Sequence, residues 1–274
     1  MAGYIWAFPG THFRSIVTVA SSPGDLSGFP ATNIKLYSRP NIPWISSDTP
    51  TVTTNTWIGV DLGTVPTIPT VTAIVIDNIN ISSLIIETGT NISFSSITAN
   101  SGAITVNQNA VDGRYKLFYV PTGSLATAHQ YWRVRSLVGV RTDGTQGPMS
   151  VGSVTFLTGT LTWAMGSAEY DETPIQSVLP NDNFAGGGAA PIILGNPTAG
   201  ITLNAQAIAP QDRTLTRADL LTVLRQSIGS WMVFFRNNGD PSDVYICRRT
   251  SDLQVRQTFP SVIEYQSLTL EGAV

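Results

Sequence analysis

The chain has 274 residues, a formal net charge of −3 and 12% charged residues, which is about half the usual share of charge. Lysine and arginine form no cluster interleaved with aromatic residues, which argues against nucleic-acid binding. No window approaches the roughly 18 apolar residues of a membrane span, and the start of the chain lacks the features of a signal peptide. These features predict a protein made in a cytoplasm, with no membrane insertion, whose weakly charged surface packs against other chains.

Short runs of β-branched and aromatic residues dominate the first part of the chain. They span residues 15–19, 71–76, 83–87, 116–120 and 132–135. Turn signals such as Asp112-Gly113 and Asp143-Gly144 separate such runs, and no helical pattern intervenes. This density of strands and turns predicts a β-sandwich.

Residues 57–63 read W-I-G-V-D-L-G. Side chains alternate along a strand, so Trp57 and Asp61 share one face, and Ile58 and Val60 share the other. We expect Asp61 to accept hydrogen bonds from the backbone of the next turn, where Gly63 permits a positive φ. Trp57 is expected to be a core aromatic.

The phrase at 57–63 is followed by Y-W-R-V at 131–134, and is flanked by A-T-N-I at 31–34, W-I-S-S at 44–47 and a closing strand at 151–157. In these motifs the chain resembles discoidin-like, galactose-binding-like β-sandwich domains over residues 20–160. The resemblance implies a jelly-roll domain over residues 1–160. Some members of that family carry a calcium site, and the sequence leaves open whether this domain has one.

Residues 180–200 are rich in glycine, proline and alanine and predict an extended arm that orders against a neighbour. A helix is predicted over 217–228, because Thr216 with Asp219 approximates a capping box and Gly229 is a stop signal. The apolar positions of this helix are Leu220, Leu221, Leu224 and Ile228.

Strands are predicted at 231–235, 243–248 and 264–272, with a hairpin loop at 237–241. Residues 161–274 are thus expected to form a second β-sandwich or barrel domain braced by one helix. The fold class is therefore mainly β.

The sequence offers no catalytic constellation. His12 and His129 lack partners at metal-ligand spacing, no G-x-S-x-G elbow is present, and the acidic run 169–172 is expected to be an exposed turn. Cys247 lies in an apolar run and is expected to be buried and inert. We predict a protein that is not an enzyme, with no metal and no cofactor.

Carbohydrate binding is the alternative function. Exposed aromatic side chains can stack on sugars, and the candidates are Trp44, His129, Trp132 and Arg133. The competing interpretation is that the tryptophans are core aromatics, each burying on the order of 200 Å².

The second half carries a further set of motifs: L-T-R-A-D-L-L at 215–221, W-M-V-F-F-R-N-N-G at 231–239, Y-I-C-R at 245–248, S-D-L-Q-V at 251–255 and L-T-L-E-G at 268–272. In them the chain resembles tail-tip and baseplate proteins of long-tailed bacteriophages. The common distal-tail proteins place the ring-forming domain first, whereas here it would come second.

This second resemblance implies a structural virion protein of the distal-tail type, located at the tail tip. It would self-associate into a ring, expected to be hexameric, and dock tube, hub or fibre proteins; a cell-surface glycan is a further partner under the alternative function. A ring needs a heterologous interface on two different faces. The expected interface residues are Phe184, Gly186, Gly187, Gly188, Leu220 and Leu224.

Overall fold

A computed structural model describes residues 4–8, 12–14, 19–20, 43–46, 56–64, 67–68, 70–137, 141–158, 161–164, 169–179, 192–204, 232–237, 239–249, 255–259, 262–265 and 268–272. Over these residues the protein is mainly β with antiparallel sheets, as the sequence predicts. The described part of the chain contains one short 3-10 helix, η1 (Gly123–Ala126). The predicted helix 217–228 lies outside the described residues, as do residues 180–191 of the predicted arm.

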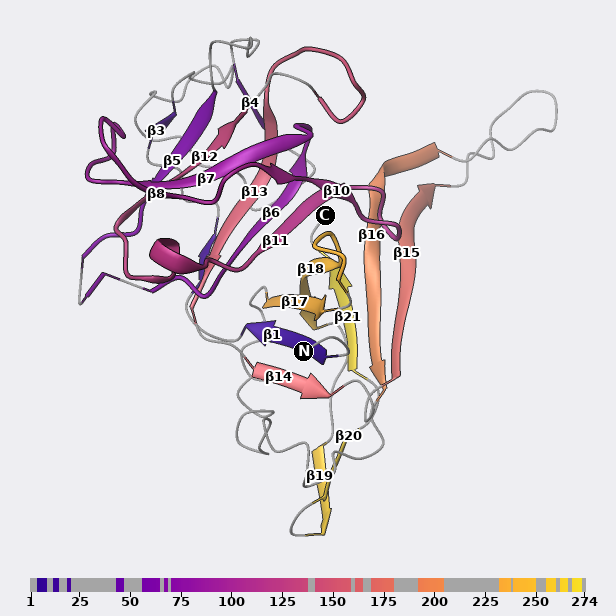
Figure 1. Ribbon diagram of the computed structural model, residues 1–274. Coiled ribbons are helices and arrows are strands. Elements are labelled where there is room, and N and C mark those ends of the chain that lie inside the picture. The colour runs from indigo at the N-terminus through magenta and orange to yellow at the C-terminus, as the bar shows by residue number, and fades with distance from the viewer. Residues whose placement is uncertain are drawn as a thin grey trace, which may run out of the picture.

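Two sheets face each other in the part of the molecule at the upper left of Figure 1. The outer sheet has the order β3 (Val19–Ala20), β5 (Trp57–Asp61), β12 (Tyr131–Ser136), β7 (Ser83–Gly89), β8 (Ile97–Asn100), and β9 (Ile104–Thr105) also pairs with β7. The middle sheet has the order β10 (Asn107–Gln108), β11 (Tyr115–Tyr119), β6 (Ala73–Ile79), β13 (Ser150–Leu157), β2 (His12–Arg14), and β4 (Trp44–Ile45) also pairs with β13.

The main hydrophobic core lies between the outer and middle sheets. Ile58 and Val60 of β5 point into it, together with Trp132 of β12 and Phe156 of β13. The predicted alternation of β5 is therefore confirmed, since Ile58 is 0% and Val60 is 1% exposed. These two sheets form a sandwich over a shared apolar interior.

A third sheet joins the two ends of the chain. Its order is β14 (Leu161–Ala164), β1 (Tyr4–Phe8), β17 (Met232–Asn237), β18 (Val244–Arg249), β21 (Leu268–Gly272), β16 (Ile192–Asn204), β15 (Glu169–Leu179). A separate hairpin pairs β19 (Val255–Phe259) with β20 (Val262–Tyr265). Because β1 belongs to this sheet, residues 4–8 lie with the second half of the chain, although the predicted boundary at 160 assigns them to the first domain.

The middle sheet is covered on both faces. On the face away from the sandwich core, Val75 and Phe118 pack against Phe235 and Ile246 of the third sheet. The rings of Phe118 and Phe235 stack with centroids 3.8 Å apart and an interplanar angle of 11°. The burial of β6 is correspondingly almost continuous, as expected for a strand buried on both sides.

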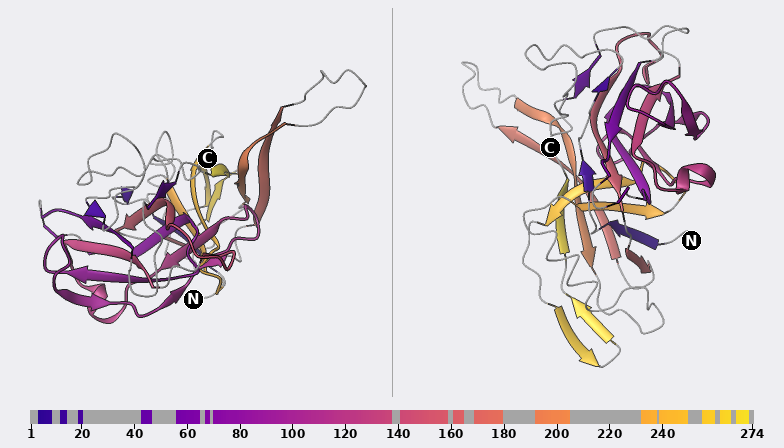
Figure 2. Two further views of the ribbon diagram at one scale, coloured as in Figure 1. Left: turned by 90° about the horizontal axis from the view of Figure 1, so that it is seen from above. Right: turned by 90° about the vertical axis from the view of Figure 1, so that its left-hand side faces the viewer.

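Strands β15 and β16 form a long hairpin at one edge of the third sheet. β16 pairs with β21 only over residues 200–203, whereas its pairing with β15 continues to Leu179 and Ile192. Both views of Figure 2 show this end of the hairpin standing away from the rest of the protein. Residues 192–200 of the predicted arm are thus part of a strand.

Two local predictions are wrong. The acidic run 169–172 is the start of strand β15, and an exposed turn there is excluded by its ladder with β16. The predicted final strand 264–272 is divided, because its first residues belong to β20 in the small hairpin and its last to β21 in the third sheet. Alternation alone does not mark the change of partner between them.

Candidate functional site

The structure does not bring the residues predicted to bind carbohydrate together at an exposed site. Trp44 is 1% exposed and Trp132 is 0% exposed, and both belong to the sandwich core. The indole Nε1 of Trp132 donates to the carbonyl oxygen of His129 at 3.0 Å. Because both tryptophans are enclosed, neither presents a ring face to a sugar.

His129 lies in the connection that follows η1. Its Nε2 lies 2.8 Å from the carbonyl oxygen of Ser124 and 3.1 Å from the hydroxyl of Thr127. Its ring meets Trp132 edge-on, with centroids 5.6 Å apart. These contacts give His129 a local packing role.

Asp61 caps the end of β5 as the sequence predicts. Its carboxylate Oδ1 accepts hydrogen bonds from the backbone N–H of Gly63 at 2.8 Å and from the side-chain amide of Gln130 at 3.0 Å. Gly63 has a φ of +75°, which a residue with a Cβ adopts only with strain. The W-I-G-V-D-L-G phrase therefore builds a strand and the turn after it.

Arg133 belongs to a cluster on the face of the outer sheet that points away from the core. This outer-face cluster consists of Trp57, Glu87, Phe94, Arg133 and Arg135. Trp57 is partly exposed, so the expectation that it is a core aromatic is wrong. Strand alternation places it opposite Ile58, on the solvent side of the sheet.

Glu87 holds both arginines of the cluster. Its carboxylate accepts hydrogen bonds from Nε of Arg133 at 2.6 Å, and from Nε and Nη2 of Arg135 at 3.0 and 2.9 Å. Burial raises the pKa of Glu87, but the hydrogen bonds and charges of Arg135 and Arg133 outweigh it, so the pKa is lowered from its ordinary value. The cluster carries one more positive than negative charge, since two arginines face one glutamate.

Aromatic rings fix the position of Arg133. Its guanidinium carbon lies 5.5 Å from the ring centroid of Trp57 and 5.0 Å from that of Phe94. The two rings meet edge-on at 5.2 Å. Phe94 reaches this position because it lies against Gly89, where a Cβ would come within 2.8 Å of its ring.

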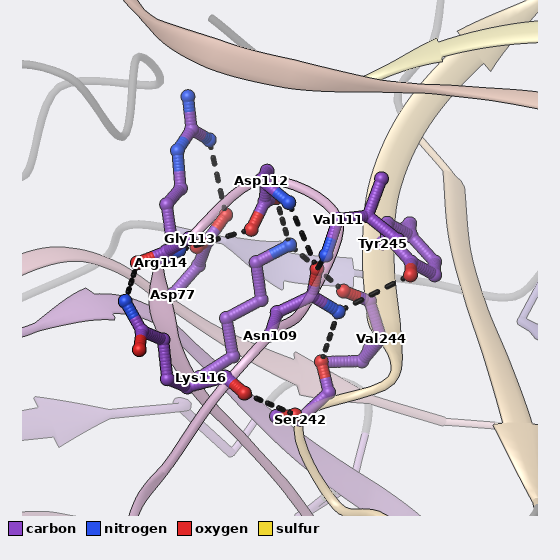
Figure 3. Close-up of polar contacts among 11 residues, drawn as sticks. Asp77, Asn109, Val111, Asp112, Gly113, Arg114, Lys116, Ser242, Val244 and Tyr245 are labelled. Atoms are coloured by element: carbon purple, nitrogen blue, oxygen red, sulfur yellow. Dashed lines mark hydrogen bonds and ion pairs between the residues drawn. The ribbon is translucent and has the colours of Figure 1, made fainter. Parts of the chain in front are cut away.

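A second polar cluster joins the middle sheet to the third sheet (Figure 3). The ammonium group of Lys116 is paired with Asp112 and donates to the carbonyl oxygen of Val244 at 3.1 Å. The side-chain amide of Asn109 donates to the carbonyl oxygen of Ser242 at 2.9 Å and to the hydroxyl of Tyr245 at 3.1 Å. We call these six residues the junction network.

The loop before β11 holds the polar groups of the junction network in place. Oδ1 of Asn109 accepts from the backbone N–H groups of Val111 and Asp112, at 2.9 and 3.1 Å. Gly113 follows with a φ of +69°, confirming the turn predicted at Asp112-Gly113. Lys116 is 2% and Asp112 is 3% exposed, so the network is a buried connection with no free surface for a ligand.

Sequence reasoning missed both clusters. The signal for the junction network is Lys116 within the apolar strand Y-K-L-F-Y, because a buried lysine needs a partner. Its contacts with residues 242–245 are far away in sequence and leave no spacing pattern. For the outer-face cluster the signal is R-V-R at 133–135, which places both arginines on one face of a strand.

The described residues contain no group of three or more His, Cys, Asp or Glu side chains that could hold a metal ion. Among them, no helix is long and apolar enough to cross a membrane. The interface candidates Phe184, Gly186, Gly187, Gly188, Leu220 and Leu224 lie outside the described residues.

In comparisons with models of known protein families, with curated proteins and with solved structures, nothing matches the chain.

Proposed function

We propose that the chain is a structural virion protein of a long-tailed bacteriophage, a distal-tail-type component of the tail tip that self-associates into a ring. The sandwich formed by strands β2 to β13 would be its discoidin-like domain, docking other tail proteins. The observation that carries the proposal is the hairpin of β15 and β16, which continues past the third sheet as a ribbon of two strands.

The far end of this ribbon has an apolar sequence. The register pairs Val178 with Ile193 and Leu179 with Ile192, so apolar residue types occupy both strands. A two-stranded ribbon alone is marginally stable in water, and apolar segments of this kind are typical of contacts with another chain. A neighbouring copy would provide that contact.

The third sheet supports a head-to-tail arrangement. Within the described part of the chain, β14 pairs only with β1 and β15 pairs only with β16, so the sheet ends in two different edges. Edges accept further strands. Contact between different surfaces of successive copies is the kind that closes into rings.

The test is removal of the ribbon. Ile175 and Thr198 are paired positions, so residues 176–197 can be replaced by an Asn-Gly turn without disturbing the ladder with β21. We expect the parent chain to form a ring by light scattering and negative-stain microscopy, and the shortened chain to stay monomeric with a similar Tm. Ile45→Ser, at a residue 46% exposed on β4, is the control and should leave the mass unchanged.

A monomeric parent chain at concentrations of about 100 μM, far above ordinary interface Kd values, would overturn the proposal. So would a shortened chain that assembles as the parent does.

Carbohydrate recognition is the second candidate, and the observation that favours it is the position of Trp57 beside Arg133. A partly exposed indole next to a fixed guanidinium offers both stacking and hydrogen-bond donors. Under this function Trp57→Ala should abolish a signal on a glycan array with a small change in Tm, whereas Trp44→Ala should disrupt the core. An array without signal for the parent chain would exclude the candidate.

A further inference from the structure

Three buried oxygen atoms lie on the face of the middle sheet that meets the third sheet. They are Oδ1 of Asp77, Oγ of Ser153 and Oγ1 of Thr155, and no hydrogen-bond partner reaches any of them. The three residues are 3%, 0% and 1% exposed.

The strand register brings these oxygens together. Ser153 on β13 is directly opposite Asp77 on β6, and Thr155 is the next residue on the same face of β13. Directly opposite residues in an antiparallel pair have Cβ atoms about 5 Å apart. The register therefore places these three residues next to one another on one face of two neighbouring strands.

Leaving these groups unpaired would be unfavourable. Nη1 of Arg114 lies 3.7 Å from Oδ2 of Asp77, which is too long for a hydrogen bond. A buried carboxylate oxygen without a hydrogen bond is costly, and a buried unpaired hydroxyl also destabilises a fold. Native structures satisfy such groups with ordered water that makes about three hydrogen bonds.

We propose that the junction holds a buried water site bounded by Asp77, Ser153 and Thr155. Water can donate to Oδ1 of Asp77 and can accept from the hydroxyls of Ser153 and Thr155. This water site extends the junction network across the middle sheet, because Asp77 is also directly opposite Lys116 of β11.

Charge favours water over a cation at this position. Asp77 is within ion-pair distance of Arg114, and Asp112 is paired with Lys116, so each of these two buried acids has a buried base beside it. A cation would add a positive charge close to the buried bases Arg114 and Lys116. A neutral molecule adds none.

The direction in which the Tm changes in two variants tests whether water occupies the site. Ser153→Ala and the isosteric Thr155→Val each remove one hydroxyl and keep every charge. If water occupies the site, each variant loses a hydrogen bond and its Tm should fall by about 2–4 °C. If the site is dry, each variant removes an unpaired buried group, and an unchanged or higher Tm would overturn the proposal.

The control is Ser46→Ala. The hydroxyl of Ser46, 2% exposed, accepts a hydrogen bond from the backbone N–H of Met149 at 2.9 Å, so this variant should lose Tm whatever occupies the junction. A high-resolution crystal structure gives the direct readout, with water density expected within hydrogen-bond distance of Asp77 and Ser153. A bound cation predicts a different result: the Tm of the parent chain would be higher in sodium or potassium chloride than in choline chloride, and the Tm of Asp77→Asn would not. That result would show that a cation occupies the site and would overturn the proposal.

Discussion

The ammonium group of Lys116 donates a hydrogen bond to the carbonyl oxygen of Val244 at 3.1 Å, across 128 residues of sequence. The contact joins a strand of the middle sheet to a strand of the third sheet. Asp112, also buried, neutralises the charge of Lys116. The two parts of the molecule are therefore connected by a specific polar contact beside the apolar one formed by Phe118 and Phe235.

Lys116→Met should strongly destabilise the protein, because it leaves the Asp112 carboxylate buried without its partner. Breaking one side of a buried ion pair costs about 3–5 kcal/mol. Adding Asp112→Asn removes the stranded charge and should restore part of the loss. Chemical denaturation of the two variants measures this, and a double variant less stable than Lys116→Met would contradict the interpretation.

Tyr245→Phe should cost about 1 kcal/mol, because Asn109 loses one acceptor but keeps the carbonyl oxygen of Ser242. Asn109→Asp should cost more. It keeps the acceptor for the loop amides but turns a carboxylate oxygen toward that carbonyl, replacing an attraction by a repulsion. The comparison uses unfolding free energies at neutral pH, and equal losses would show that Asn109 does not hold the junction.

Features built within a few neighbouring residues could be predicted from the sequence. The cap at Asp61 involves Gly63, two positions away, and the glycine turns at 113 and 144 depend on their own φ values. Alternation likewise located the buried residues of β5. Each of these depends on local geometry, which the sequence encodes directly.

Features that depend on distant partners could not be predicted. Trp57 lies on the solvent side because the outer sheet has no third layer among the described residues, whereas Val75 is buried because the middle sheet has one. The acidic run 169–172 forms an edge strand because β16 lies beside it. The residue types in these segments do not indicate that the third sheet covers Val75 or that β16 lies beside residues 169–172.

Glu87→Gln should destabilise the protein at neutral pH by about 2 kcal/mol, because the charge-assisted hydrogen bonds to Arg133 and Arg135 weaken. The folded-state pKa of Glu87 is lowered from its ordinary value of 4.5. The stabilisation is therefore complete above pH 4.5 and is lost as the pH falls through the lower, folded-state value. The stability difference between parent and variant should be constant from pH 7 to about 4.5 and shrink below it. A difference that grows on acidification would show that another group dominates.

Gly89→Ala should displace Phe94 from the outer-face cluster. An added Cβ would lie 2.8 Å from Cδ1 of Phe94 and 3.1 Å from the carbonyl oxygen of Ser96, so the loop between β7 and β8 must shift. Trp57 would lose its edge-on contact with the ring of Phe94, and Arg133 would lose one of the two aromatic rings that its guanidinium contacts. We expect a loss of about 1–3 kcal/mol from overpacking, with a change in tryptophan fluorescence before unfolding. Phe94→Leu in the same background provides the check, because a smaller, flexible side chain should recover stability if the clash is the cause. A double variant as unstable as Gly89→Ala would place the strain in the backbone at Ser96.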